Sequence, residues 1–513
     1  MDNKSSSPLS FFTEKEIPHF SENIRQLILD YLSSDEINEA LTVAELAEKF
    51  SFINVPESGV EPDEFLKIFK DLILPHSINT GSPYFIGHMT SLLPNFLRPL
   101  SELLTALNQN IVKVETAKAA TFYEKHALAM IHKEVFGQSD NFYDECASHP
   151  EISLGIVTSG GTIANLTALQ CARDLSLSKY GDIEEDGIQG AMNAGGFTKS
   201  VVLGTHLGHY SLVKSMGLLG MGRSNYIEID TDENQSLDTK HLRLELERCR
   251  TENIHVTAIV GIAGTTECGS FDPLDKMAQL AEEFGVYFHV DAAWGGALLF
   301  SEQYRHCLKG IERADSITID GHKQLYLPMG IGLLLFKEAK TAQVISVEAD
   351  YIIRKNSWDL GRVSIEGSRP AKVFYLQAAL QMFGRRGYGE LLEKCINVAQ
   401  ELAENIQEAA EFELVTQPQS NIFLYRYIPE KYRGLHSFSD SVNKEIDDFN
   451  ICLQEIQKDR GKTFVSRTRF SFLGQEQSIV VLRVVIANPL TNLEHCQEVL
   501  NDQFAIAQEL ESK

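Results

Sequence analysis

The chain has 513 residues, of which 43% are apolar, and its 46 basic against 71 acidic residues give a formal net charge of −25. A surface this acidic repels nucleic-acid phosphates and anionic lipids, so we expect a small-molecule partner and no nucleic acid or membrane. The sequence starts without the basic and apolar regions of a signal peptide, and its apolar runs are too short to cross a bilayer, which favours a soluble cytoplasmic protein.

The first part of the chain is predicted to be helical. Residues 20–75 and 97–136 place apolar side chains three and four positions apart, which is typical of amphipathic helices. Between them, the Pro- and Gly-containing stretch 76–95 indicates a loop. We therefore expect residues 1–95 to form an N-terminal helical segment that takes part in dimerisation.

From about residue 152 the pattern changes to an alternation of strands and helices. This order predicts an α/β domain with a mostly parallel sheet, in which ligands bind at the carboxyl ends of the strands. We expect a large domain over residues 96–370 and a small α+β domain over residues 371–513, where the order of elements is mixed. The short apolar or β-branched runs that indicate the strands of the large sheet are 152–159, 200–205, 226–230, 255–264, 286–293, 316–321 and 330–336.

The cysteines point to neither metal nor disulfides. There are eight, and none lies in a C-x-x-C pair or at zinc-finger spacing, so we predict no metal site and no disulfide framework. Scattered thiols of this kind suit a reducing cytoplasm.

Two of the predicted strands end in residues that together suit pyridoxal 5′-phosphate (PLP). One predicted strand ends at Ile319 and is followed by Asp320, Gly321, His322 and Lys323, and the run VYFHV delivers Asp291 at its carboxyl end, before two alanines. Alone, such a lysine is usually solvated, and such an aspartate often caps a helix. As a pair they match the lysine that forms an imine with PLP and the carboxylate that keeps its pyridine nitrogen protonated.

The stretch TSGGTIAN (158–165) could hold the cofactor phosphate. It follows a predicted strand and opens a predicted helix, where Ser159, Gly160, Gly161 and Thr162 offer hydroxyl and N–H groups at a positive helix end. It matches neither a dinucleotide G-x-G-x-x-G nor a P-loop. A Gly-Gly turn on its own is often only a tight loop.

In combination and in this order, the three motifs resemble the group II PLP-dependent amino-acid decarboxylases, which include glutamate and aromatic amino-acid decarboxylases. The resemblance extends from Pro83 to Pro489 and includes LGHYS (207–211), VGIAGTTECGSFDPL (260–274) and LRVVIANP (482–489). It implies the fold-type I architecture of PLP-dependent transferases, PLP as the cofactor and a homodimer.

The resemblance also implies roles for individual residues. Lys323 would be the Schiff-base lysine, Asp291 would pair with the pyridine nitrogen, and Arg483 would take the substrate α-carboxylate. His209 would stack on one face of the cofactor ring and assist proton transfer, and Ala293 would lie against the other face. The remaining cofactor contacts implied are Thr265 near the ring oxygen and Ser159, Gly161, Thr162 and His322 at the phosphate.

Two loops bear on the substrate. In glutamate decarboxylases the loop equivalent to SPYFIGHMTS (82–91) touches the distal carboxylate, and His88 stands where those enzymes have glutamine. NIVKVETAK (110–118) matches a second loop, with Lys118 in place of proline. Together with Lys113, these residues would supply positive charge for an acidic substrate. Charged loop residues are, however, often only solvated.

The motifs GHMTS, QNIVKVETAKA, YIIRKNSWDLG and EGSRP most resemble the bacterial glutamate-decarboxylase-like aspartate 1-decarboxylases, which make β-alanine. Conversion of glutamate to 4-aminobutyrate is the alternative. The proton donor to Cα stays open between Tyr351, Arg354 and His209, because alignment puts Arg354 where the glutamate enzymes have a tyrosine. More distant alternatives are an aminotransferase, a carbon–carbon lyase, or a non-catalytic relative, against which the intact Lys323 argues.

Overall fold

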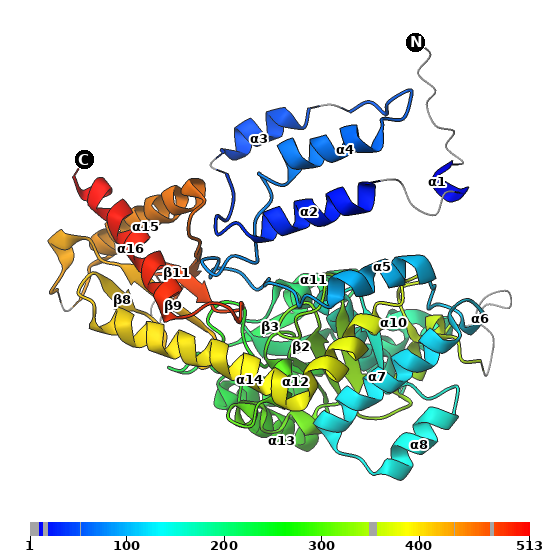
Figure 1. Cartoon of the computed structure of the whole chain (residues 1–513). Helices are drawn as coiled ribbons and strands as arrows, with labels where there is room; N and C mark the ends of the chain where they lie inside the picture. Colours follow the sequence, from blue (N-terminus) through cyan, green and yellow to red (C-terminus); the bar gives the residue numbers. More distant parts are fainter. Residues whose placement is uncertain are drawn as a thin grey trace.

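The computed structural model describes residues 10–13, 19–39, 41–51, 53–347, 357–435, 437–471 and 477–512. Its N-terminal helices are α1 (Ser10–Thr13), α2 (Phe20–Leu32), α3 (Val43–Lys49) and α4 (Pro62–Ile68), the last continued by a π-helical turn. Helices α2, α3 and α4 form a layer that stands apart from the rest of the molecule (Figure 1). None of the helices in the described residues is both long enough and apolar enough to cross a membrane.

The large sheet has seven strands in the order β1-β7-β6-β5-β4-β2-β3. Four neighbouring pairs are parallel, whereas β7 is antiparallel to both β1 and β6. All strands except β7 therefore run in one direction, and their carboxyl ends meet at one edge. The strands are β1 (Gly155–Thr158), β2 (Ser200–Thr205), β3 (Tyr226–Ile229), β4 (His255–Ile262), β5 (Tyr287–Asp291), β6 (Ser316–Asp320) and β7 (Gly332–Phe336).

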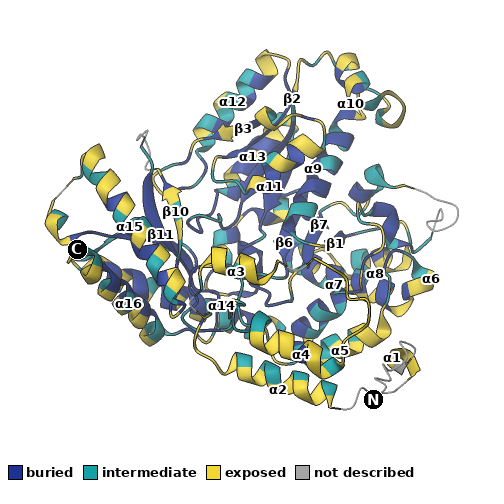
Figure 2. Ribbon diagram, turned by 90° about the horizontal axis from the view of Figure 1, so that it is seen from above, coloured by how far each residue is buried: buried dark blue, intermediate teal, exposed yellow. Residues whose placement is uncertain are grey.

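Helices cover both faces of this sheet because its buried strands are apolar on both sides. Ile259 of β4 packs into the core formed with α7, α12 and α13, whereas its neighbour Val260 packs into a second core formed with α9 and α11. The interior is buried throughout while the outer helix faces are exposed (Figure 2). The helices around the sheet are α5 (Leu97–Leu107), α6 (Val114–Ala117), α7 (Ala119–Phe136), α8 (Asp140–Ser148), α9 (Gly161–Leu177), α10 (Ile183–Ala194), α11 (Tyr210–Leu218), α12 (Thr239–Thr251) and α13 (Leu274–Phe284).

A second, antiparallel sheet forms the C-terminal lobe. Its strands follow the order β10-β11-β9-β8, with β8 (Phe412–Leu414), β9 (Ile422–Tyr427), β10 (Ser466–Phe470) and β11 (Ile479–Val485). Helices α15 (Asp440–Arg460) and α16 (Leu493–Glu511) cover it. The long helix α14 (Val373–Glu408) kinks at Gly384, where φ is 62°, and packs its first half on the large core and its second half on the small one.

The loop after α4 is tied to the C-terminal lobe. The N–H of Ile86 donates to the carbonyl of Phe464 (3.0 Å), and the N–H of Val485 donates to the carbonyl of Ile86 (2.7 Å). These bonds fix the position of the following residues between the two lobes. The architecture confirms the predicted α/β fold of type I with a helical N-terminus and a small α+β lobe.

Candidate active site

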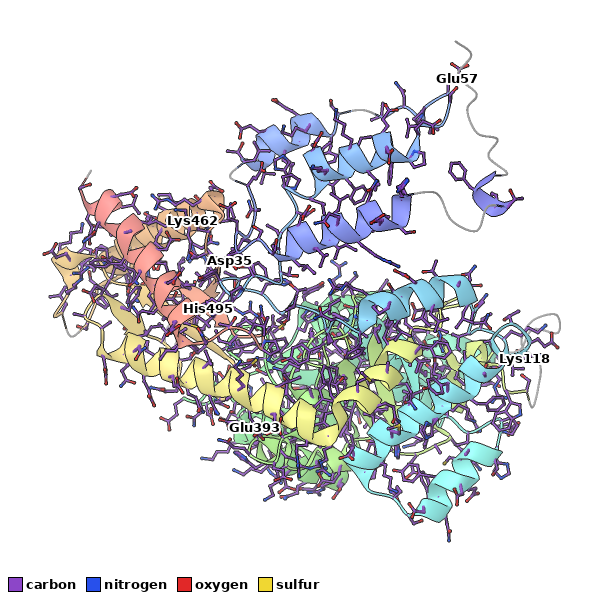
Figure 3. The ribbon with its side chains drawn as sticks, viewed as in Figure 1. Asp35, Glu57, Lys118, Glu393, Lys462 and His495 are labelled. Atoms are coloured by element: carbon purple, nitrogen blue, oxygen red, sulfur yellow. The ribbon has the colours of Figure 1, made fainter. Side chains whose placement is uncertain are left out.

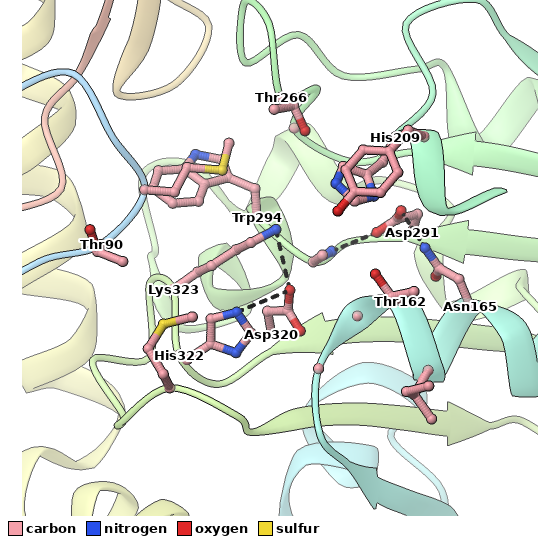
Figure 4. Close-up of a pocket in the computed structure, with 18 of the residues that line it drawn as sticks. Thr90, Thr162, Asn165, His209, Thr266, Asp291, Trp294, Asp320, His322 and Lys323 are labelled. Atoms are coloured by element: carbon pink, nitrogen blue, oxygen red, sulfur yellow. Dashed lines mark hydrogen bonds and ion pairs between the residues drawn. The ribbon is translucent and has the colours of Figure 1, made fainter. Parts of the chain in front are cut away.

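The carboxyl ends of β1, β5 and β6 and the first turn of α9 surround a cavity of about 500 Å³. Figure 4 shows its lining, in which side chains from the large sheet face a loop of the N-terminal part at Thr90. Of the residues predicted from the sequence, those that line this cavity are His88, Ser159, Gly161, Thr162, His209, Asp291, Ala293, His322 and Lys323.

Lys323 enters the cavity from the loop that follows β6. Its Nζ lies 3.2 Å from Oδ2 of Asp320, the last residue of that strand, and the same oxygen is 3.7 Å from Nε2 of His322. The Nδ1 of His322 donates to the carbonyl of Ile331 (2.9 Å), which orients the imidazole. Among the described residues that line the cavity, Lys323 carries the only primary amine, and it is held close to the end of a buried strand.

Asp291 ends β5 and is 5% exposed. Its Oδ1 accepts the N–H of Ala293 (3.1 Å), and its Oδ2 accepts an N–H of the Asn165 side chain (2.7 Å). Both bonds stabilise a carboxylate facing the cavity, because neither partner can accept a proton from it.

His209 lies just before α11, in contact with the exposed ring of Tyr210 (centroids 4.2 Å apart). Its Nδ1 is 2.8 Å from Oγ of Ser211. Burial lowers the pKa of His209, and the charge of Lys323 acts in the same direction while Asp291 opposes it. The imidazole is therefore neutral near pH 7.

The first turn of α9 has the features of an anion cradle. Helix α9 begins at Gly161 without a side-chain cap in the described part of the chain, so its first N–H groups face the cavity. A Cβ on Gly161 would lie 2.9 Å from Oδ2 of Asp320, and one on Gly332 would lie 2.6 Å from the backbone carbon of Gly160. Only glycine fits at either position, because the two strand ends approach so closely.

These residues fit PLP. A lysine amine, a carboxylate, a half-buried imidazole and an uncapped helix terminus converge on one cavity, and the small side chain of Ala293 leaves room for a flat ring. The N–H of Ser159 donates instead to Oε2 of Glu366 (3.0 Å), so the cradle depends mainly on Gly161 and Thr162.

Two predicted contacts lie outside the cavity lining. The hydroxyl of Thr265 is fully buried, where it accepts the N–H of Ser270 (3.0 Å), and Thr266 lines the cavity in its place. Arg483 lies behind the lining, where its Nε donates to the carbonyl of Thr266 (2.7 Å). Its Nη2 is buried and has no hydrogen-bond partner among the described residues, so it can still bind an anion.

Electrostatics links Arg483 to its neighbours. Burial lowers the pKa of Arg483 to about 10, opposed mainly by Glu267, whose own pKa burial raises. The pKa of His88 is lowered by burial, then by the charges of Arg483 and Lys323. His88 is thus uncharged near pH 7, and the positive charges of Arg483 and Lys323 both act on it.

The other residues predicted to supply positive charge do not reach the cavity. Lys113 pairs with Glu115 at 2.5 Å. Lys118 is exposed at the junction of α6 and α7, where Figure 3 labels it, in a backbone conformation with φ of 35°. Neither belongs to the cavity lining. Tyr351 and Arg354 lie outside the described residues.

Besides Thr266, sequence reasoning missed four further residues of the site. Asn165 and Asp320 line the cavity, and Ser211 connects to both Asn165 and His209. Trp294 forms part of the wall, and its Nε1 donates to Oδ1 of Asn421 in the C-terminal lobe (3.1 Å). Asn165 and Ser211 fall within the motifs TSGGTIAN and LGHYS, but nothing in those motifs indicates that the two residues meet.

The fold, and a cavity whose residues fit PLP at the carboxyl edge of a mostly parallel sheet, are those of a PLP-dependent enzyme. Residues 54–428 match the pyridoxal-dependent decarboxylase conserved domain, and the chain belongs to that family. It is a PLP-dependent amino-acid decarboxylase.

Individual relatives differ in what they are named for. Aspartate 1-decarboxylase of Aliivibrio fischeri is 42% identical over 96% of this chain and 91% of its own. L-2,4-diaminobutyrate decarboxylase of Acinetobacter baumannii is 26% identical over 94% of this chain and 90% of its own. The acidic amino acid decarboxylase GADL1 of Xenopus tropicalis is 25% identical over 96% of this chain and 93% of its own. The crystal structure of mouse CSAD superposes with a TM-score of 0.85 at 21% identity, covering 98% of this chain and 99% of that one, which shows the shared fold.

Proposed function

We propose that this enzyme decarboxylates L-aspartate to β-alanine and CO2. The observation that carries the proposal is the 42% identity with an aspartate 1-decarboxylase across nearly all of both chains. Membership of the family alone would not choose this substrate, since a relative at 26% identity is named for a basic amino acid.

Positive charge in and behind the cavity wall supports an acidic substrate, because Lys323 lines the cavity and Arg483 lies behind Thr266. Arg483 keeps a buried, unpartnered Nη2 in the described structure, and a desolvated guanidinium gains most from a carboxylate, which pairs with it in a planar geometry. His88 lies within the electrostatic reach of Arg483 and Lys323. An amino acid with two carboxylates can satisfy both Arg483 and the His88 side of the cavity, whereas a cationic side chain would be repelled.

When bound, PLP would supply a sink for the electron pair released when the Cα–carboxylate bond breaks. Lys323 would hold the cofactor, and the Asp291 carboxylate would keep the proton on its ring nitrogen. Arg483 binds the α-carboxylate and orients the bond to be broken. Aspartate and one proton give β-alanine and CO2, and the proton is added at Cα. We propose that His209, which lines the cavity, delivers it; Tyr351 and Arg354 are candidates from the sequence alone.

L-Glutamate is the second candidate substrate. It carries the same two charges, and an acidic amino acid decarboxylase is among the relatives. One extra methylene changes discrimination by only about 1–3 kcal/mol, so we expect both acids to react with unequal efficiency.

We also propose a homodimer in the cytoplasm. The eight cysteines are all free, which suits a reducing compartment. Residues 1–95 would form the dimerisation segment, 96–370 the cofactor domain and 371–513 the small domain. The exposed apolar side chains of α2, α3 and α4 support the first assignment, because a second subunit would cover them.

A direct assay tests the substrate. The PLP-loaded enzyme is incubated separately with aspartate, glutamate, 2,4-diaminobutyrate and tyrosine, and the released CO2 and amine are measured. We expect the highest kcat/KM with aspartate, a lower value with glutamate and none with the other two. Turnover of tyrosine or diaminobutyrate with both acids inert would overturn the substrate and leave the cofactor site intact.

A further inference from the structure

One buried amide connects the groups on the far side of the cavity from Lys323. Asn165 lies on α9, is 1% exposed and points at Asp291 (Figure 4). Its Nδ2 is 2.7 Å from Oδ2 of Asp291 and 3.1 Å from Oγ of Ser211, and its Oδ1 is 3.1 Å from Nε2 of His289. All the hydrogen-bonding atoms of this side chain are therefore used inside the protein.

The chemistry of the partners fixes the direction of each bond. An ionised carboxylate only accepts, so the amide NH2 group must face Asp291 and the amide oxygen must face His289. His289 must then donate from Nε2. Burial lowers the pKa of His289 to about 4, so the imidazole is neutral near pH 7. With its proton on Nε2, Nδ1 can only accept, and the Ser316 hydroxyl 2.8 Å away donates to it.

The same argument extends to His209. Because Oγ of Ser211 accepts from Asn165, its own proton is free to point at Nδ1 of His209, 2.8 Å away. The backbone N–H of Ser211 is directed at the same nitrogen (3.3 Å). Nδ1 of His209 is thus an acceptor, and the proton of the neutral imidazole is on Nε2.

We propose that Asn165 is the positioning residue of this site. Through one amide it holds the Asp291 side chain in place and, through Ser211, it fixes the ring of His209 with its proton on Nε2. The inference rests on the cofactor site proposed above, because Asp291 and His209 are the groups expected at the ring nitrogen and the ring face. It does not depend on which amino acid is the substrate.

Several titratable groups surround this network. His209 experiences the charges of Asp291, Lys323 and Asp320, while His289 and Tyr226 both experience Asp291. Each of these is present in the wild-type protein and in every variant below. A pH effect that arises only when Asn165 is replaced therefore belongs to the replaced side chain.

The experiment uses three variants and two readouts. Binding of PLP to the apoprotein is followed by quenching of tryptophan fluorescence, since Trp294 lines the cavity, and kcat is measured across pH. Asn165→Ala should weaken PLP binding by roughly tenfold or more, because Asp291 loses a charge-assisted bond. Ser211→Ala should weaken PLP binding less than Asn165→Ala does, because the bond from Asn165 to Asp291 is kept, and should shift the pH profile of kcat. Thr167→Val, which removes a buried hydroxyl of α9 bonded only to the carbonyl of Ile163, should change neither readout.

An isosteric variant separates positioning from simple support of the fold. Asn165→Asp places a second carboxyl group against Asp291, and two such groups cannot both ionise at this distance, so one keeps its proton to a higher pH. As pH falls, the substituted group becomes protonated and can donate again. PLP affinity should therefore recover on acidification in Asn165→Asp but not in Asn165→Ala, which cannot regain a donor.

Two results would overturn the proposal. One is wild-type PLP affinity in Asn165→Ala. The other is a loss in Asn165→Asp that is the same at every pH, which would mean that the residue only supports packing. Circular dichroism of each apoprotein checks folding, and if Asn165→Ala fails to fold, the acid recovery of Asn165→Asp decides alone.

Discussion

The Nζ of Lys323 lies 3.2 Å from Oδ2 of Asp320, whose Oδ1 is buried and has no hydrogen-bond partner among the described residues. This pairing holds the lysine amine at the cavity wall, and Lys323 is therefore the expected attachment point of PLP.

Borohydride reduction of the yellow holoenzyme should abolish its aldimine absorbance, and peptide mapping should then find the cofactor on Lys323. Lys125 is the alternative attachment point to check, because burial lowers its pKa to about 8 and leaves more of its amine unprotonated. Cofactor found on Lys125 would contradict the assignment of Lys323 as the Schiff-base lysine. Lys323→Ala should lose turnover by orders of magnitude while keeping its fold.

Asp291 should matter more to turnover than to cofactor binding. In Asp291→Asn the side chain keeps its shape, but it can no longer hold the ring nitrogen protonated. We expect kcat to fall far more than PLP affinity does, measured by steady-state kinetics and by fluorescence titration of the apoprotein. Near-normal kcat in this variant would contradict the pairing of Asp291 with the ring nitrogen.

His88 should take up a proton when an acidic substrate binds. Its pKa is lowered in the free enzyme by burial and by two cations, and a substrate carboxylate beside it would raise that pKa. Between the two values binding consumes a proton, so the KM for aspartate should rise as pH increases. His88→Gln should raise KM and flatten this dependence, whereas the exposed His306→Gln should leave it intact. The same slope in wild type and His88→Gln would exclude the linkage.

Acid should destabilise the protein through three buried histidines. His132, His255 and His289 have pKa values lowered to about 4, mainly by burial. Between pH 6.5 and 4 the unfolded chain binds these protons and the folded chain does not, so stability is lost as pH falls, with a slope of about 1.4 kcal/mol per pH unit for each histidine. Urea unfolding at pH 7 and pH 5 measures this loss. His132→Gln should reduce the loss, and replacement of the exposed His19 should not.

The last prediction is that the protein forms a homodimer in solution. Helices α2 to α5 expose more large apolar side chains than a monomer usually leaves in water, including Leu29, Val43, Phe65 and Leu103. Sedimentation should show a dimer. A double substitution of Leu29 and Phe65 by serine should shift the protein towards monomer, whereas serine at Leu244, exposed on α12, should not. A fully active wild-type monomer would contradict the proposal.

The sequence predicted most of the fold because buried strands leave apolar runs that can be recognised one by one. It did not predict that β7 runs against its neighbours, since an apolar run carries no direction. The connection from Asp320 to Gly332 held a clue, because so short a link without a helix favours an antiparallel return.

The site was predicted less evenly. Lys323 and Asp291 follow strand ends, where position alone suggests function. Thr265 and Thr266 are adjacent, and only the folded loop, in which the hydroxyl of Thr265 binds the N–H of Ser270, shows that Thr266 faces the cavity. Asn165 carries no local signature, because its partners lie on two other elements, β5 and α11, that are far from it in the sequence.

The reversed strand also determines when the cofactor site can exist. Thr158 and Asp320 both pair with Gly332, so β1 joins the sheet only through β7. As the polypeptide leaves the ribosome, β1, which leads into the loop 158–162 proposed to hold the cofactor phosphate, is made early but has no strand to pair with until residues 332–336 emerge. Closing so long a loop is slow, because its entropy must be paid before the strands pair. Nascent chains that stop short of β7 should therefore fail to bind PLP. The vitamin-derived cofactor can bind only after the large domain has been synthesised through β7.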